Sequence, residues 1–378
     1  MTSLARQTLL FEWRRFLPAV LAIGFSSLLL LLQAALVLGI FGSASVYVSG
    51  SSADLWLGYP GTQSVDQGRP VDPGLASLLL MDPQVERVEP FYWLDADWRG
   101  PAKDTGGVSV YVSGIDISAH GLMFSRALSP ELRRRLALPD SVIVDRAELD
   151  KLGASVGSGA YVNGHRVRVV GTSAGLRALG GVNIVASLDT ARRLQAGAGG
   201  ATWPAYFVAR LRDPAQSDAV ARRLGGQSGF GRYEVWTARQ FARQSMLFWM
   251  FDTGAGAGVL FLAGIVLLVG AVITSQALVA AVAGSVREYA TLNALGISMR
   301  SLRWVVLEQA VWVGAIGVAI ATGLGAVLIA LARSRDVPVM FNLHVTAVCV
   351  LVVMLLASVS GISALRSLRR ADPAVLLR

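Results

Sequence analysis

The sequence predicts an α-helical membrane protein with four transmembrane helices plus an α+β extracytoplasmic domain inserted between helices 1 and 2. Three observations predict this fold class. The chain of 378 residues is 53% hydrophobic with a mean hydropathy of +0.53, a value that soluble domains of this length rarely reach. Its apolar residues gather in four long runs. A long segment of mixed composition separates the first run from the second.

Each apolar run is long enough for a membrane span, which needs about 20 residues to cross about 30 Å of hydrocarbon. The first run could instead be a cleaved signal peptide, because Ser43-Ala44-Ser45 resembles a small-residue cleavage site. The apolar region of a signal peptide is only about 7–15 residues long, so an uncleaved anchor is favoured. The four spans are expected at residues 17–41, 254–283, 304–332 and 344–365.

Arginine is concentrated in the segments that flank these spans, and this sets the expected orientation. The N-terminus 1–16, the connection 284–303 and the tail 366–378 hold most of the net charge of +9, whereas the large segment 42–253 is nearly balanced. The positive-inside rule places these three segments in the cytoplasm. The segment 42–253 then lies outside, and so does the short loop 333–343, which is a mild exception to the rule with a net charge of +1. Nucleic acid binding, the other usual explanation of a pI near 10.3, is not expected, since the charges lie at membrane ends.

The external segment mixes strand and helix patterns. The clearest signal is the alternation of apolar and polar residues in 161–170 around Asn163-Gly164, which predicts a β-hairpin with a type I′ turn. Residues 238–251 contain neither Gly nor Pro and are expected to form a stalk helix that runs unbroken into the second span. Further strands are expected at 54–57, 108–112, 141–144, 206–211 and 233–236, and helices at 189–195 and 214–224.

Residues that could carry chemistry are scarce in the external segment. Asp95 and Asp97 would share one face of a strand, but no His, Lys or nucleophile motif accompanies them, so solvated strand-edge charges are expected. Arg133, Arg134 and Arg135 are expected on the exposed side of a short helix, with a patch for a partner as the alternative.

Catalytic and metal-binding motifs are not found elsewhere in the sequence. The histidines are isolated, and the single cysteine, Cys349, lies in the fourth apolar run, so neither a metal site nor a disulfide framework is expected. The chain contains no GxxxxGK[ST] sequence for binding ATP, and no GxSxG, HExxH or CxxC. We therefore expect no catalytic, cofactor-binding or metal-binding residues, and a subunit that is not an enzyme.

The connection between the second and third spans contains an amphipathic stretch, "REYATLNALGISMRSLRW". Tyr289, Leu292, Leu295 and Met299 share one helical face, and Gly296 permits a bend or a helix end. An amphipathic helix here could lie in the headgroups of the membrane, or it could insert into a groove of a cytoplasmic partner. The stretch lacks the lysine-rich face of membrane-surface helices, which modestly favours the partner.

Glu308 is a charged residue within the third span, where a carboxylate costs free energy on insertion into the membrane. A carboxylate at the centre of a bilayer costs about 2.5–3.5 kcal/mol on insertion scales. Glu308 lies close to the inner interface, so its side chain could reach the headgroups, or it could contact Arg300, Arg303 or the amphipathic stretch. Gln33, Ser275 and Gln276 are expected to form hydrogen bonds between helices.

The amphipathic stretch resembles the first cytoplasmic loop of the MacB/FtsX-type (type VII) ABC transporter permeases, in which an Arg–Glu pair, a Leu and an Ala-Leu-Gly recur. The ending "LRRADPAVLLR" resembles the C-terminus of the same family. The resemblance is nearest to DevC-type permeases, through "EYATLNALG", "VIVDRA", "VNGHRVRVVGT" and "RRADPA". The matching residues of the loop are Arg287, Glu288, Leu292, Ala294, Leu295 and Gly296.

The resemblance implies that residues 287–298 form a coupling helix seated on a separate ABC ATPase subunit. It implies a permease dimer with an ATPase dimer that holds ATP and Mg²⁺, so no cofactor is expected in this chain. The implied ATPase-coupling residues are Arg287, Glu288, Tyr289, Leu292, Ala294, Leu295 and Gly296, and the implied C-terminal contacts are Asp372, Pro373 and Leu376.

The resemblance also implies a function. The chain would be a permease in the bacterial inner membrane, with both termini cytoplasmic, that converts ATP hydrolysis in its partner into movement of a periplasmic domain (mechanotransmission). A periplasmic adaptor (membrane fusion) protein and an outer-membrane channel would complete a pump for efflux of a lipid-like or amphiphilic substrate. Two alternatives within the family are extraction of lipoproteins and an FtsX-like transducer that regulates an external hydrolase. A receptor without any ATPase is a further possibility.

Overall fold

The computed structural model describes residues 11–100, 107–197, 202–225, 232–284, 298–335 and 337–370. The chain divides into two compact units. We call residues 1–39 and 257–378 the membrane unit, and residues 40–256 the external unit.

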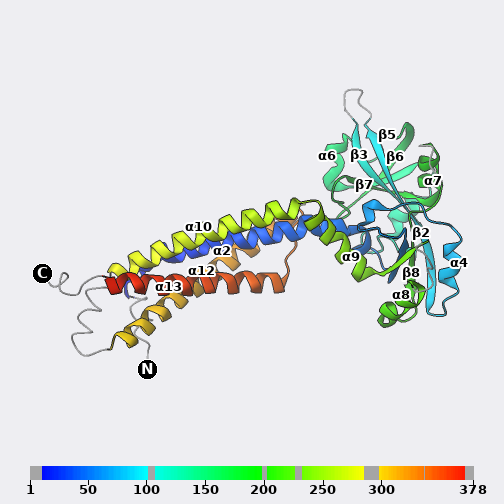
Figure 1. Cartoon of the computed structure of the whole chain (residues 1–378). Coiled ribbons are helices and arrows are strands. Elements are labelled where there is room, and N and C mark those ends of the chain that lie inside the picture. The colour runs from blue at the N-terminus through cyan, green and yellow to red at the C-terminus, as the bar shows by residue number, and fades with distance from the viewer. Residues whose placement is uncertain are drawn as a thin grey trace. The chain divides into compact units, whose positions relative to one another are not determined.

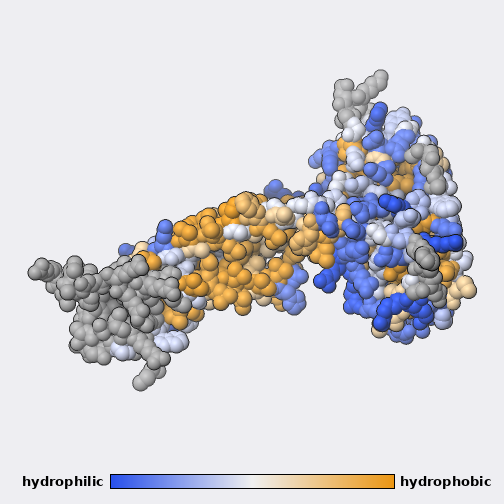
Figure 2. All heavy atoms as spheres, in the orientation of Figure 1, coloured by the Kyte–Doolittle hydropathy of each residue, from blue (hydrophilic) through white to orange (hydrophobic). Residues whose placement is uncertain are grey.

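The membrane unit consists of long apolar helices that run side by side (Figure 1). Four helices of the described residues are long and apolar enough to span a bilayer, and the external unit lies in sequence between the first and the second, which confirms the predicted fold class. Apolar residues cover the visible face of these helices (Figure 2), as a lipid solvent requires. The helices are α2 (Trp13–Gly42), α10 (Ala255–Gly284), α12 (Met299–Ser334) and α13 (Leu343–Arg370).

Small residues let these helices approach one another closely, as is usual where lipid offers no hydrophobic driving force between helices. A Cβ atom added to Gly361 of α13 would lie 2.7 Å from the Cβ atom of Ala310 on α12. A Cβ atom added to Gly314 of α12 would lie 3.2 Å from that of Ala357 on α13. Similar close contacts join α2 to α12 at Gly24 and Gly317, and α2 to α10 at Ser26 and Gly270.

In its described residues, the external unit is built on nine strands. They are β1 (Leu55–Gly58), β2 (Val85–Arg99), β3 (Val108–Ile115), β4 (Ser141–Asp145), β5 (Gly159–Val162), β6 (His165–Ser173), β7 (Val182–Ser187), β8 (Tyr206–Leu211) and β9 (Glu234–Thr237). Its α-helices are α3 (Val46–Ser49), α4 (Leu75–Leu80), α5 (Pro130–Arg135), α6 (Leu149–Leu152), α7 (Leu188–Gly197), α8 (Ser217–Gly225) and α9 (Ala238–Leu247). Short helical turns complete it at Ser43–Ser45 (η1), Val65–Gln67 (η2), Arg146–Glu148 (η3), Pro214–Gln216 (η4) and Phe248–Asp252 (η5).

The long strand β2 belongs to two arrangements. Its first half pairs with β8 in an antiparallel sheet of order β9-β1-β8-β2, with α4 joining β1 to β2 and α8 joining β8 to β9. This is a split βαβ arrangement. Its second half pairs with both β3 and β5, so that β2, β3, β7, β4, β6 and β5 close into a ring. The interior of the ring is filled mainly by valines, namely Val110, Val112, Val142, Val144, Val162, Val167 and Val169.

The two faces of the four-stranded sheet are covered by different helices. Successive side chains of a strand point to opposite faces. Leu55 and Leu57 of β1 therefore join the core under α4 and α8. Trp56, between them, joins a second core together with Tyr47 of α3 and Phe241 of α9. The second core holds the two segments through which the chain enters and leaves the external unit.

The predicted hairpin is confirmed, because β5 and β6 are joined at Asn163 and Gly164, whose φ angles of 47° and 81° are both positive, as a type I′ turn requires.

The expectation of an unbroken stalk helix is wrong. Helix α9 ends at Leu247, a π-helical turn comes next, and Gly254 adopts a φ of 75° that no α-helix contains. Two strands were not predicted, β2 and β7. Charged residues and Pro90 obscure the pattern of β2.

Candidate functional site

Most of the residues predicted to contact an ATPase lie outside the described part of the chain. This holds for the predicted coupling residues Arg287, Glu288, Tyr289, Leu292, Ala294, Leu295 and Gly296, and for the C-terminal residues Asp372, Pro373 and Leu376. Their roles stay predictions. The candidate site can therefore be built only from the membrane helices and from the two segments that connect them to the external sheet.

Glu308 lies in α12 and is half-buried, one turn after Trp304. The side chains of its predicted partners Arg300 and Arg303 are not among those described, so both interpretations of Glu308 stay open. The prediction for Gln33 is confirmed, since its Nε2 donates a hydrogen bond to the carbonyl oxygen of Val259 at 3.3 Å and so joins α2 to α10.

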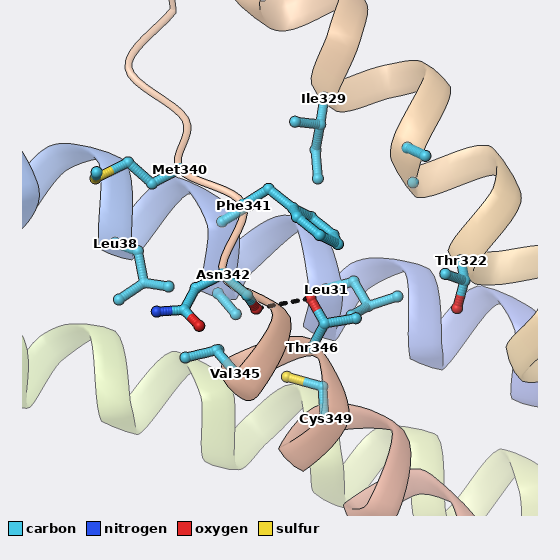
Figure 3. Close-up of a pocket in the computed structure, with 14 residues that line it drawn as sticks. Leu31, Leu38, Thr322, Ile329, Met340, Phe341, Asn342, Val345, Thr346 and Cys349 are labelled. Carbon is cyan, nitrogen blue, oxygen red and sulfur yellow. Dashed lines mark hydrogen bonds between the residues drawn. The ribbon is translucent and has the colours of Figure 1, made fainter.

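A small cavity lies among α2, α12 and α13 of the membrane unit (Figure 3). Its volume is about 20 Å³, enough for roughly one water molecule, which needs about 10–15 Å³. The segment before α13 borders it, with the backbone N–H of Met340 donating to the carbonyl of Ala35 at 3.1 Å. Asn342 begins α13, because its side-chain oxygen accepts from the N–H of His344 and its carbonyl accepts from the Thr346 hydroxyl. A cavity of this size cannot hold an amphiphile.

The two connections to the external sheet share one aromatic core. We call η1–α3 the first connection and α9–η5 the second; α9 packs against both η1 and α3. Phe241 of α9 stacks on Trp236 with ring centroids 4.6 Å apart and packs against Trp56 at 5.6 Å. Tyr47 of α3 packs against Phe91 at 6.1 Å. Aromatic pairs of this kind contribute about 0.5–1.5 kcal/mol each beyond their burial.

A loop over residues 116–124, which we call the strap, lies against the first connection. The Ser51 hydroxyl and the Ser52 N–H both donate to the carbonyl of Leu122, at 3.2 Å and 2.9 Å. Phe124 packs against Tyr47 with ring centroids 6.3 Å apart and has a φ of 52°, a conformation that a bulky residue adopts only when its surroundings impose it. The strap is thus fixed to the segment that enters from the first span.

Arg133 holds the strap from inside, which corrects the expectation that it would be exposed. Its side chain is 2% exposed, and its guanidinium donates to the carbonyl oxygens of Asp116, at 2.8 Å, Gly121, at 3.2 Å, and Met123. Burial lowers the pKa of Arg133, while the nearby carboxylates oppose this. The three carbonyls point inward and need donors, which the planar fork of arginine supplies.

Glu89 completes the inner surface of the strap. It is buried, accepts a hydrogen bond from the N–H of Leu122 at 2.8 Å, and pairs with Arg87, whose Nε lies 2.6 Å from its carboxylate. Burial raises the pKa of the Glu89 carboxyl, although the Leu122 hydrogen bond and the Arg87 charge act against this. Arg87 also pairs with Asp116 at 2.8 Å. Sequence reasoning missed Glu89; its position between apolar residues in "VEPF" is the one signal of a buried charge.

The other arginines of α5 match the prediction. Arg134 and Arg135 are exposed and pair with Glu131 of the same helix. Asp95 and Asp97 are also exposed, with Asp95 accepting a long hydrogen bond of 3.3 Å from the Ser109 hydroxyl. These residues are solvated surface charges.

The second connection is attached to the loop before α4. The indole N–H of Trp249 in the π-helical turn donates to Asp66 at 3.1 Å, and the side-chain amide of Gln244 donates to the carbonyl of Thr62 at 3.1 Å. The hydroxyl of Tyr206 on the sheet donates to the carbonyl of Val65 at 2.9 Å. Sheet, loop and second connection are therefore linked by hydrogen bonds as well as by the aromatic core.

Comparisons with known proteins identify the family. The model of the MacB-like periplasmic core domain matches residues 17–227, and that of the FtsX-like permease C-terminal matches residues 260–373. A search of curated proteins gives no match.

Two solved structures are similar to this chain. The periplasmic region of MacB from Actinobacillus actinomycetemcomitans is 11% identical, with 52% of this chain and 94% of that chain covered and a TM-score of 0.35. The extracellular domain of the noncanonical ABC-type transporter YknZ from Gram-positive bacteria is 11% identical, with 49% and 100% covered and a TM-score of 0.33. These scores are low, so the assignment rests on the family models. The chain belongs to the MacB/FtsX type of ABC transporter permeases, multi-pass membrane proteins with an FtsX-like permease region and an extracytoplasmic MacB-like domain.

Proposed function

We propose that this chain is the permease subunit of an ABC transporter in which ATP hydrolysis by a separate ATPase subunit moves the external unit. The observation that supports this most is the shared aromatic core, which fastens both connections to the same face of one sheet. A displacement of either connection is passed to the sheet, because separating them would expose Tyr47 and Phe241. Exposing one such side chain costs about 1.5–3 kcal/mol.

The small cavity of the membrane unit is not a binding site for the proposed cargo. With about 20 Å³, it is far below the 300–1,000 Å³ of pockets that bind small molecules. The proposal places the mechanical work on cargo outside the membrane helices.

The force would enter through the predicted coupling helix. In this proposal Arg287, Glu288, Tyr289, Leu292, Ala294, Leu295 and Gly296 sit on the ATPase, and Asp372, Pro373 and Leu376 provide a second contact. The permease would form a dimer with an ATPase dimer that holds the ATP and Mg²⁺, and both termini would be cytoplasmic. The family implies the ATPase partner.

We further propose a DevC-like efflux role, in which an adaptor protein and an outer-membrane channel receive a lipid-like or amphiphilic cargo. Affinity purification of the full-length complex tests this. Recovery of an adaptor supports efflux, recovery of a hydrolase supports an FtsX-like transducer instead, and recovery of a lipoprotein with no adaptor supports extraction.

Two substitutions test the coupling helix. Leu292→Asp or Leu295→Asp places a charge on the face proposed to enter the ATPase, and we expect the ATPase to be lost from the purified complex while the permease stays in the membrane. Thr291→Asp, on the polar face, is the matched control and should retain the ATPase. If both leucine variants retain it, the stretch is an interfacial helix and the proposed coupling is wrong.

A further inference from the structure

The two connections of the external unit differ in their backbone. The first is helical throughout, since α2 passes into the tight turn η1 at Ser43–Ser45 and this passes into α3. The second is interrupted between α9 and α10. Both connections are anchored in the same aromatic core, so the difference between them lies outside that core.

The interruption has two parts. The π-helical turn at Phe248–Asp252 comes first. Such turns are rare in proteins overall, and those that occur are often found at functional sites. Gly254 then takes a φ of 75°, in the left-handed region that costs other residues about 1–2 kcal/mol. Thr253 bridges the two parts, because its hydroxyl donates to the carbonyl of Trp249 at 2.6 Å and accepts from the N–H of Ala255 at 3.4 Å. The bend is therefore a defined structure and not a frayed helix end.

Glycine is required at a second position of the bend. A Cβ atom added to Gly256 would collide with the carbonyl oxygen of Met250 in the π-helical turn. Two residues later the requirement ends, since a Cβ atom added to Gly258 of α10 would have no heavy atom within 4 Å. The demand for glycine is confined to residues 254–256.

The bend is fixed by contacts of Trp249 within the external unit. On the external side, Trp249 is held by its hydrogen bond to Asp66, and its ring lies 3.3 Å from the position that a Cβ atom of Gly180 would occupy. On the membrane side, α10 is the least buried of the four spans among the described residues, with 11% of its most apolar stretch buried.

From these observations we propose that residues 253–256, which follow the second connection, are its hinge, with Trp249 as the residue that positions the fixed side, while the first connection is a continuous strut. The hinge changes direction through the backbone torsions of Thr253 and Gly254. That ATP hydrolysis drives this motion rests on the proposed function; that the hinge exists does not.

Two matched glycine substitutions test the hinge. Gly254→Ala disfavours the left-handed conformation and should shift the ratio of bent to straight backbone by about 5- to 30-fold, the factor to which about 1–2 kcal/mol converts. Gly258→Ala, four residues further in an open helical position, should change nothing. Two spin labels report the result, one at Leu138 of the external unit (59% exposed) and one at Val327 of α12 (64% exposed), after Cys349→Ala removes the native thiol. We expect the distribution of label distances to move and narrow in Gly254→Ala only.

A second pair of variants keeps the test decisive if Gly254→Ala does not fold. Trp249→Phe removes the indole N–H but keeps an aromatic ring, so the distance distribution should broaden. Asp66→Asn retains an acceptor oxygen and should leave it unchanged. Equal distributions for Gly254→Ala and Gly258→Ala, or for Trp249→Phe and the unmodified chain, would refute the hinge. Adding ATP to the complex with the ATPase then tests separately whether ATP hydrolysis moves the hinge. If the label distances show a hinge in the isolated chain but do not change when ATP is added to the complex, only the proposed function is overturned.

Discussion

Replacing Arg133 by Met should destabilise the external unit more than any change at the neighbouring arginines. Met keeps the length of the side chain and its apolar volume but removes the donors to Asp116, Gly121 and Met123. An unsatisfied buried acceptor costs about 1–3 kcal/mol. Glu89 keeps its ion pair with Arg87 in the variant, so the three carbonyl oxygens left without a donor set the cost. We therefore expect a loss of about 3–5 kcal/mol.

Urea unfolding of the purified chain, followed by tryptophan fluorescence, measures this loss. With a slope of about 1–3 kcal/mol per molar urea, the midpoint of the external unit should fall by more than about 1 M. Arg134→Met is the matched control, since the Arg134 side chain is 74% exposed and pairs only with Glu131 among the described residues, and its midpoint should barely change. Equal midpoints for the two variants would show that the strap is not held by Arg133, and the account of the first connection would be wrong.

Three further predictions concern other parts of the structure. Burial raises the pKa of Glu89 above its ordinary value of 4.5, so the folded chain binds more protons at this residue than the unfolded chain. The free energy of unfolding should therefore fall as the pH rises from about 4.5 through the raised pKa. Urea unfolding at a series of pH values measures this dependence, and Glu89→Gln should remove it. Phe241→Ala should lower the free energy of unfolding by about 3–5 kcal/mol, seen with the same probe. Gly361→Leu should drive α13 away from Ala310 and lower the melting temperature of the membrane unit in detergent, whereas Gly264→Leu on the open side of α10 should not.

The membrane helices and the hairpin could be predicted because their signals are local. An apolar run of sufficient length has few alternatives to a span, and Asn163-Gly164 is one of the few dipeptides that accept positive φ at both positions. The strand β2 could not be predicted, since its first half and its second half face different cores. No single alternation describes a strand that changes sheets, and Pro90 within it is usually read as a strand breaker.

The burial of Arg133 could not be predicted for a different reason. Three consecutive arginines predict an exposed helix face, and for Arg134 and Arg135 this is correct. Whether Arg133 is buried depends on the strap, whose carbonyls at Asp116, Gly121 and Met123 accept from its guanidinium. The partner of Arg133 is thus created by tertiary structure, and no spacing within the sequence records it.

The stalk shows how a local rule fails at a junction between two kinds of solvent. The absence of Gly and Pro from residues 238–251 permits a helix but does not oblige it to continue in α-helical register. Trp249 forms a hydrogen bond with Asp66, a contact that competes with a regular α-helical continuation of α9. The backbone is a π-helical turn where this contact forms. The next residues, Thr253-Gly254, then permit the chain to leave the turn in a new direction. In the proposed function, motion would pass from the membrane helices to the sheet through η1–α3, and the proposed hinge at residues 253–256 would accommodate it on the other connection.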